Sequence, residues 1–159
     1  MMFDEFRALD YLASRAEIDP QRLGVLGMSM GSTKAWWLAA LDRHVRVCMD
    51  VCCLTDFDEL IRTQALKEHG IFYYVPSLLK HFQTAQINEL SVPRPHLSVN
   101  GRQDPLTPPA GVEKIRDSLM PLYRQTARSE TAASSCMIAH TWSCRRCASW
   151  FWNGWTGIW

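Results

Sequence analysis

The fold of this chain is decided by the stretch Leu23-Gly24-Val25-Leu26-Gly27-Met28-Ser29-Met30-Gly31. Its apolar start predicts a short buried strand over residues 23–26, and residues 32–41 have the pattern of a helix. A G-x-S-x-G pentapeptide between a strand and a helix is typical of a nucleophile elbow, a sharp turn that presents a serine hydroxyl. We expect glycine at positions 27 and 31 because the turn is too tight there for side chains. The alternative interpretation is a glycine-rich turn with an incidental serine.

The helix that follows Ser29 has an electrostatic consequence for the same turn. Its first backbone amides and the positive end of its dipole would lie beside the serine hydroxyl. An oxyanion formed during attack by that hydroxyl would be stabilised at this position. The pattern therefore favours a catalytic serine over an incidental one.

Length and composition set the class of protein. The chain has 159 residues, enough for one domain with a real core, with 47% hydrophobic and 21% charged residues. Its formal charge of +1 gives no preference for nucleic acids or for membrane surfaces. It has no apolar run of membrane-spanning length and no secretory signal, so we expect a cytoplasmic chain with reduced cysteines. Three of these, Cys48, Cys52 and Cys53, are expected to act as small hydrophobic residues in a strand.

Strand-like and helix-like segments alternate along the chain. Beyond the elbow, strands are expected over residues 45–54 and 96–99. Helices are expected over residues 3–12, 55–67 and 112–123, and a helical insertion over residues 71–82 is expected to lie over the site. Alternation of this kind predicts an α/β fold, with a parallel sheet covered by helices.

An acidic partner for Ser29 is expected after a later strand. A serine hydroxyl needs a base and a group that orients the base, and sheet-based hydrolases carry them in the order Ser, Asp or Glu, His. Asp104 follows the predicted strand at 96–99 in a glycine-containing turn, as a triad acid would. It could equally be a turn-forming Asp before Pro105. The competing acids, after the preceding strand, are Asp50, Asp56 and Asp58.

Chain order nominates the base as well. His140 is the only histidine after Asp104, although a lone histidine in a loop is often just solvated. The other histidines are expected on helix surfaces or strand edges, and they are His44, His69, His81 and His96.

These residues resemble the α/β-hydrolase superfamily and, within it, the dienelactone hydrolase and acetyl xylan esterase-like branch. The resemblance covers residues 3–125 and rests on Ile18-Asp19-Pro20-Gln21-Arg22-Leu23-Gly24-Val25 before the elbow, and on Gly101-Arg102-Gln103-Asp104-Pro105-Leu106. It implies that Ser29 is the nucleophile, Asp104 the triad acid and the Met30 amide one oxyanion donor. The base of the family is a histidine in a loop after the next strand, for which His140 is the candidate.

Two departures from the family pattern matter. The family has several strands before the elbow, and a loop among them supplies the second oxyanion donor, so the resemblance implies a partial fold lacking the N-terminal strands. Loss of one such donor lowers turnover about 100- to 1000-fold. The second departure is that the tail does not resemble the family's final strand, histidine loop and closing helix.

The chain changes character at about residue 126. Five of its seven tryptophans fall in the last eighteen residues, with no amphipathic period. Read in the neighbouring frame, the codons of Met137-Ile138 encode Asp and those of Trp152-Asn153 encode Glu, and the permitted choices elsewhere give an amphipathic helix. We therefore hypothesise that residues 126–159 are translated out of frame. The C-x-x-C pair of Cys144 and Cys147 has no second pair nearby, so no metal site is expected there.

The sequence leads to one expected function and one alternative to it. We expect a carboxylesterase-like serine hydrolase that acts on a small-molecule ester through an acyl-enzyme, without metal or cofactor. Acyl transfer would use the same residues. The alternative is a non-catalytic remnant, whose unpaired sheet edge would permit self-association. An aromatic set could line an apolar substrate pocket or pack in the core, and it comprises Trp36, Trp37 and residues 72–74.

Overall fold

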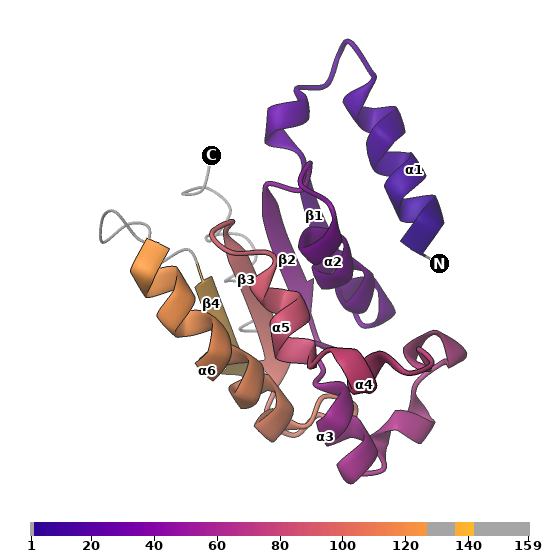
Figure 1. Cartoon of the computed structure of the whole chain (residues 1–159), viewed down its shortest axis with the longest axis vertical. Coiled ribbons are helices and arrows are strands. Elements are labelled where there is room, and N and C mark those ends of the chain that lie inside the picture. Colours follow the sequence, from indigo (N-terminus) through magenta and orange to yellow (C-terminus); the bar gives the residue numbers. More distant parts are fainter. Residues whose placement is uncertain (1, 127–135, 142–159) are drawn as a thin grey trace.

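Four parallel strands form the centre of the molecule. The computed structural model describes residues 2–126 and 136–141, the latter as backbone only. The strands are β1 (Gly24–Met28), β2 (Val47–Val51), β3 (His96–Gly101) and β4 (Cys136–Thr141). They lie in the order β1-β2-β3-β4, each parallel to the next, so every connection crosses over one face of the sheet (Figure 1).

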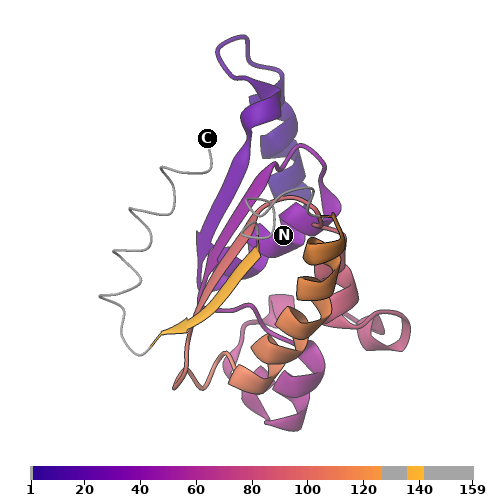
Figure 2. The same cartoon turned by 90° about the vertical axis from the view of Figure 1, so that its left-hand side faces the viewer.

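Helices provide these connections and cover one face of the sheet, as Figure 2 shows. The longer helices are α1 (Met2–Ala13), α2 (Met30–Leu41) and α6 (Pro109–Thr126). Between β2 and β3 the chain forms a set of short helices: α3 (Phe57–Arg62), η2 (Ala65–Glu68), η3 (Ile71–Tyr73), α4 (Leu78–His81) and α5 (Thr84–Glu89). A 3₁₀ turn, η1 (Pro20–Arg22), precedes β1. The segment from α3 to α4 lies at the carboxyl ends of the strands (Figure 1).

The main core fills the space between the sheet and these helices. Its largest fully buried side chains include Trp36 of α2, Leu60 of α3, and Ile115, Leu119 and Tyr123 of α6. The last three recur at helical spacing, so one stripe of α6 faces the sheet. The expected α/β class, a parallel sheet covered by helices, is therefore confirmed.

Several element boundaries differ from the sequence expectations. The strand expected over residues 45–54 covers only Val47–Val51, so Cys52 and Cys53 follow the strand, and the helix expected over residues 55–67 is divided into α3 and η2. β1 continues to Met28, so the elbow turn begins at the end of the strand. Helix α5 has no counterpart in the expected elements, because its six residues are too few to show a period. The tail was expected to lack a final strand, yet Cys136–Thr141 pairs with β3. Strand pairing uses backbone groups, so it needs no strong side-chain pattern. The frameshift hypothesis for the rest of the tail lies outside the described residues.

β1 forms one edge of the described sheet. On this strand Leu26 is 47% exposed and Met28 is 68% exposed. Exposed apolar side chains on an edge strand without charged residues favour pairing with another strand. Among the described helices, none is long and apolar enough to cross a membrane.

The two glycines of the elbow differ in what they tolerate. A Cβ on Gly27 would lie 1.9 Å from the Gly31 carbonyl oxygen, whereas a Cβ on Gly31 would meet no described heavy atom within 4 Å. The expectation of a tight turn is thus correct for Gly27 and wrong for Gly31. A side chain at Gly31 points into open space because this residue already lies in the first turn of α2.

We expect Gly27→Ala to lower the free energy of unfolding by about 3 kcal/mol or more, because the added methyl group cannot be accommodated without moving the backbone. The measurement is urea denaturation, with Gly31→Ala as the matched control. Gly31→Ala should leave stability unchanged or raise it slightly, since alanine is the better helix former. Equal losses in both variants would contradict this account of the turn.

Candidate active site

Ser29 is held in a strained turn at the end of β1. Its backbone has φ 56° and ψ −122°, a conformation that non-glycine residues rarely adopt. The Ser29 amide donates to the Val51 carbonyl at 2.9 Å, which ties the turn to β2. Ser29 is the N-cap residue of α2, but its side chain makes no capping hydrogen bond. A serine recruited only to begin the helix would normally use its hydroxyl for that bond.

The chain after β2 forms the neighbouring wall. Cys52 and Cys53 both have positive φ, 57° and 103°. Two hydrogen bonds fix this bend: Trp36 Nε1 donates to the Cys53 carbonyl at 3.1 Å, and the Leu54 amide donates to Asn100 Oδ1 at 3.3 Å. Two consecutive non-glycine residues in this region store strain, which is common at functional sites.

The bend places the Cys53 thiol at the centre of a polar cluster. The side chains of Tyr73, Thr107 and Ser29 lie near enough to the thiol for each of them to lower its pKa. Burial raises the pKa of Cys53 above its ordinary value, and these neighbours only partly offset the effect. The thiol is therefore neutral at physiological pH, and it acts as a polar neighbour of Ser29 rather than as a second nucleophile.

Asp104 joins the same cluster from the loop after β3. Its Oδ2 accepts from Thr107 Oγ1 at 3.1 Å, and its Oδ1 accepts from the Leu106 amide at 2.9 Å. These bonds stabilise the turn, as the simpler interpretation of this residue predicted. Thr107 also lies near the Cys53 thiol and lowers its pKa, as Ser29 does, so Thr107 and Cys53 are the side chains between Asp104 and Ser29. Each carboxylate oxygen keeps acceptor capacity beyond these bonds.

The competing acids have other tasks. Asp50 is fully buried in the middle of β2, where it accepts from Ser32 and Ser98. Asp56 caps α3 through the Glu59 amide and pairs with Lys114. Asp58 is exposed on α3, with 66% of its side chain accessible. Asp104 is thus the acid that shares contacts with the Ser29 cluster.

For the remaining two predicted site residues, Met30 and His140, the backbone position is the relevant observation. Met30 is the first residue of α2, where amides have no acceptor within the helix, as an oxyanion donor requires. His140 lies within β4, paired with Asn100 on β3, rather than in a loop after that strand. Its side chain lies outside the described part of the structure, so its role as the base stays a prediction.

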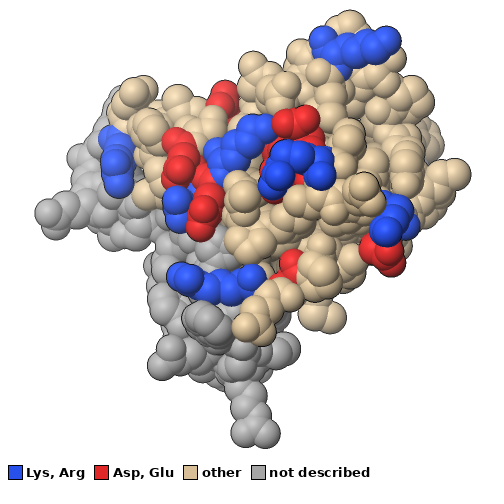
Figure 3. All heavy atoms as spheres, turned by 90° about the horizontal axis from the view of Figure 1, so that it is seen from below, with Lys and Arg blue, Asp and Glu red and all other residues tan. Residues whose placement is uncertain are grey.

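The segment between β2 and β3 is attached to both sides of the cluster. The Tyr73 hydroxyl makes a hydrogen bond with Thr33, one helical turn beyond Ser29. His69 Nε2 bonds the Leu106 carbonyl at 2.8 Å, and its ring lies 4.2 Å from that of Tyr73. His69 was expected on a helix surface, and that expectation is wrong because a contact distant in sequence places it here. Figure 3 shows this end of the molecule, where charged side chains gather near the middle of the face.

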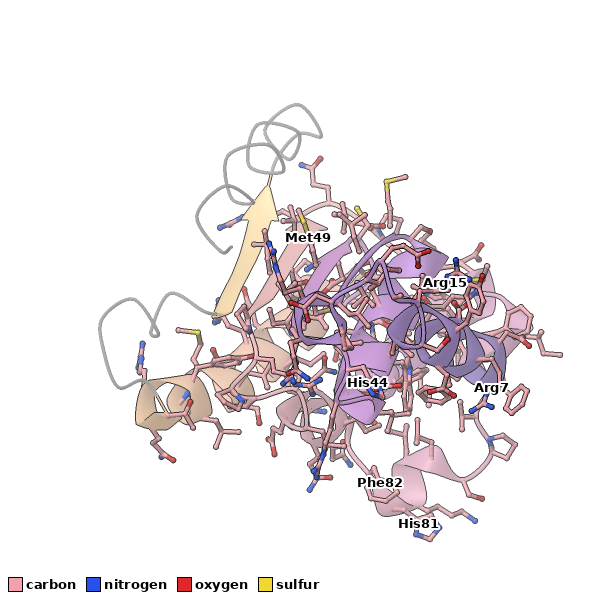
Figure 4. All side chains as sticks on the ribbon, turned by 90° about the horizontal axis from the view of Figure 1, so that it is seen from above. Arg7, Arg15, His44, Met49, His81 and Phe82 are labelled. Atoms are coloured by element: carbon pink, nitrogen blue, oxygen red, sulfur yellow. The ribbon has the colours of Figure 1, made fainter. Side chains whose placement is uncertain are left out.

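The other histidines divide into two groups. His44 pairs with Asp42 and is half exposed, on the turn between α2 and β2, opposite the Ser29 end. His81 lies at the periphery beside Phe82, and both are labelled in Figure 4. The surface expectation is confirmed for these two. It is wrong for His96, which is 2% exposed on β3 and bonds Asp50 Oδ2 through Nε2 at 2.6 Å.

His96 belongs to a buried polar layer that is not among the sequence expectations. Polar side chains alternate along β3, where Ser98 donates to Asp50 at 2.7 Å and Asn100 donates to Ser98 at 2.9 Å. Every second residue of a strand points to the same face, so the polar residues His96, Ser98 and Asn100 indicate in the sequence that one face of this strand is polar. The layer lies beneath α2, to which Ser32 connects it.

Cys48, Asp50 and His96 carry side chains of the kinds that bind metals. Their ligand atoms all lie within 4.8 Å of one another, and thiolate, carboxylate and imidazole are donors that suit zinc. His96 Nε2 and Asp50 Oδ2 are 2.6 Å apart. This leaves too little room for an ion with bonds of about 2.0 Å to each atom in tetrahedral geometry. Burial also raises the pKa of Cys48 above its ordinary value. We describe the three residues as a polar core.

The polar core predicts a pH-dependent stability. Burial alone would lower the pKa of His96, but the neighbouring Cys48 and Asp50 outweigh burial, and the pKa lies well above its ordinary value. The ion pair thus stabilises the fold fully below about pH 6.5, and this contribution is lost as pH rises through the folded-state pKa. Urea denaturation should show a lower free energy of unfolding at pH 9 than at pH 6.

The matched variants are His96→Gln and His44→Gln. His96→Gln should remove most of this difference between the two pH values, whereas His44→Gln, at an exposed site, should keep it. An unchanged pH dependence in His96→Gln would show that another group causes it.

Sequence comparison finds a relative that is described as a hydrolase. No family model matches the sequence. The chain is 51% identical over 123 residues to "Putative hydrolase YtaP" of Bacillus subtilis (strain 168), which covers 77% of this chain and 41% of the relative. The chain therefore spans about two fifths of the length of that relative.

Solved structures share the fold at low sequence identity. A CE15 glucuronoyl esterase from Teredinibacter turnerae T7901 superposes with a TM-score of 0.67 at 17% identity, over 98% of this chain and 44% of the esterase. A glucuronoyl esterase from Solibacter usitatus gives 0.61 at 20% identity, over 77% and 35% of the two chains. The α/β-hydrolase fold implied by the sequence is confirmed. The dienelactone hydrolase and acetyl xylan esterase-like branch stays a prediction.

Proposed function

We propose that this chain carries the nucleophile and the acid of a serine ester hydrolase. The observation that carries the proposal is the geometry of Ser29, a non-glycine residue at φ 56° between β1 and α2 whose hydroxyl is not used to cap the helix. The hydrolase relative and the shared esterase fold support the same class of reaction. Asp104, which is connected to Ser29 through Thr107 and Cys53, supplies the acid.

The reaction would follow the usual two steps of acyl transfer. Ser29 Oγ attacks the ester carbonyl while the base, His140 by chain order, takes its proton, and Asp104 stabilises the resulting imidazolium. The Met30 amide, at the positive end of α2, stabilises the oxyanion. The alcohol leaves with the proton, and water then attacks the acyl-enzyme to release the acid and free Ser29. An alcohol in place of water would give acyl transfer from the same intermediate.

Rapid mixing with p-nitrophenyl acetate tests this proposal. An acyl-enzyme that forms faster than it hydrolyses releases a burst of about one p-nitrophenol per chain before the steady rate. Release at the rate of buffer alone would contradict the proposal.

That outcome would favour the alternative of a non-catalytic remnant, which the exposed Leu26 and Met28 on the edge strand β1 also support. The alternative predicts self-association through this edge. Gel filtration measures it directly, because a remnant that pairs its edges would elute as a dimer or larger species.

A further inference from the structure

An apolar pocket of about 230 Å³ lies in the segment between β2 and β3. Phe57 and Ile61 line it from α3, and Leu66, Tyr73, Leu78 and Leu79 contribute from the following turns. Tyr74, Val75 and Pro76 complete the wall, so the lining carries no charged side chain. The pocket is smaller than the roughly 300–1,000 Å³ typical of sites for drug-sized ligands. Its size and lining suit one aliphatic or aromatic group rather than a whole sugar.

Tyr73 connects this pocket to the Ser29 cluster. Its ring lines the pocket, while its hydroxyl bonds Thr33 and lies beside the Cys53 thiol, which in turn contacts Ser29. Thr33 is itself tied to the nucleophile turn, because its amide donates to the Ser29 carbonyl at 3.2 Å. The polar end of one side chain thus faces the candidate catalytic centre and its ring faces the pocket.

The pocket segment is also fixed to the loop that carries Asp104. The His69 ring contacts that of Tyr73 at a tilted angle, and His69 bonds the Leu106 carbonyl, two residues beyond Asp104. Hydrogen bonds therefore connect the pocket segment both to the helix that follows Ser29 and to the loop of Asp104. Binding of a remote part of a substrate accelerates the reaction only when the pocket holds the reacting group in the correct position beside the catalytic residues.

Only some of the aromatic residues that were expected to line a substrate pocket line this one. Tyr73 and Tyr74 line the pocket. Trp36 is 1% exposed in the core, stacked on Trp37 at 5.1 Å, so these two rings pack as structural residues. Phe72 is 52% exposed.

We propose that the pocket binds an uncharged aliphatic or aromatic arm of the ester that Ser29 attacks, so the substrate class is esters with one medium-sized apolar group. This inference rests on the proposed function. Each methylene that becomes buried should improve binding about fourfold. A substrate whose arm reaches the pocket should therefore exceed methyl acetate in kcat/KM by about tenfold or more.

The experiment compares methyl acetate, methyl octanoate and octyl acetate by titration of the released acid, so that an apolar arm on either side of the ester is probed. We expect at least one long ester to be preferred about tenfold or more. Ile61→Trp, at a position 53% exposed on the pocket rim, narrows the pocket and should reduce this preference at least about fivefold. Leu90→Trp, 58% exposed and outside the pocket, is the matched control and should keep the preference.

Calorimetry on Ser29→Ala measures ester binding in the pocket separately from ester hydrolysis. This variant should bind at least one of the long esters more tightly than methyl acetate, and Ile61→Trp in the same background should weaken that binding. Binding without hydrolysis by the parent chain would support the pocket and contradict the proposed function. Hydrolysis with no chain-length preference, or a preference unchanged by Ile61→Trp, would overturn the pocket.

Discussion

Replacement of Ser29 by alanine is expected to reduce the hydrolysis of p-nitrophenyl acetate to the rate of the buffer. The substitution removes the only atom that the proposed reaction uses to form the acyl-enzyme, and loss of the nucleophile in a serine hydrolase lowers turnover by about 10⁴- to 10⁶-fold. The backbone strain at Ser29 is the same for alanine, so the variant should fold as the parent chain does. Steady-state release of p-nitrophenol, measured beside thermal unfolding, checks both statements.

Ser14→Ala is the matched control for Ser29→Ala. Ser14 follows α1 and uses its hydroxyl for a local bond to the Tyr11 carbonyl at 2.8 Å, on the exposed surface. This variant should keep the parent rate. Equal rates for Ser29→Ala and the parent chain would mean that the measured hydrolysis does not come from the elbow.

The second large effect is expected for Asp104→Asn. An amide can still accept the Leu106 hydrogen bond that shapes the turn, but it carries no negative charge to stabilise an imidazolium. Loss of this charge in a triad lowers kcat by about 10⁴-fold while the substrate still binds. We expect kcat to fall with little change in KM and in the melting temperature.

The control for Asp104→Asn is Asp58→Asn, a second acid that the sequence offered as a competitor. Asp58 lies exposed on α3, 3.7 Å from Lys114, and is not part of the cluster around Ser29. Its substitution should leave kcat unchanged. A large loss in Asp58→Asn together with an active Asp104→Asn would reverse the assignment of the acid.

Local signals were enough to predict the elements that carry the site. The strand before Ser29, the helix after it and the turn at Asp104 each have a pattern that depends on neighbouring residues alone. The prediction that position 27 needs glycine is confirmed. The chain turns back so sharply from strand to helix that the Gly31 carbonyl occupies the space that a side chain at position 27 would need. The same argument failed at Gly31, which already belongs to the regular helix.

Contacts between distant segments could not be predicted in the same way. His69 and Tyr73 reach the site from a segment whose short helices have no clear period, and they contact Leu106 and Thr33, 37 and 40 residues away. His96 looked like a strand-edge residue because its partner Asp50 is 46 residues distant. Only the alternation of polar residues along β3 indicates the buried polar layer.

The most direct test of the account is covalent capture of the nucleophile by a fluorophosphonate, followed by mass spectrometry of the peptides. The reagent reacts with a serine only when a base and an oxyanion site activate its hydroxyl. The account predicts one phosphonyl group per chain, located on Ser29, with slower labelling of Asp104→Asn. An unmodified chain, or labelling at other residues that is equally fast in Ser29→Ala, would contradict it.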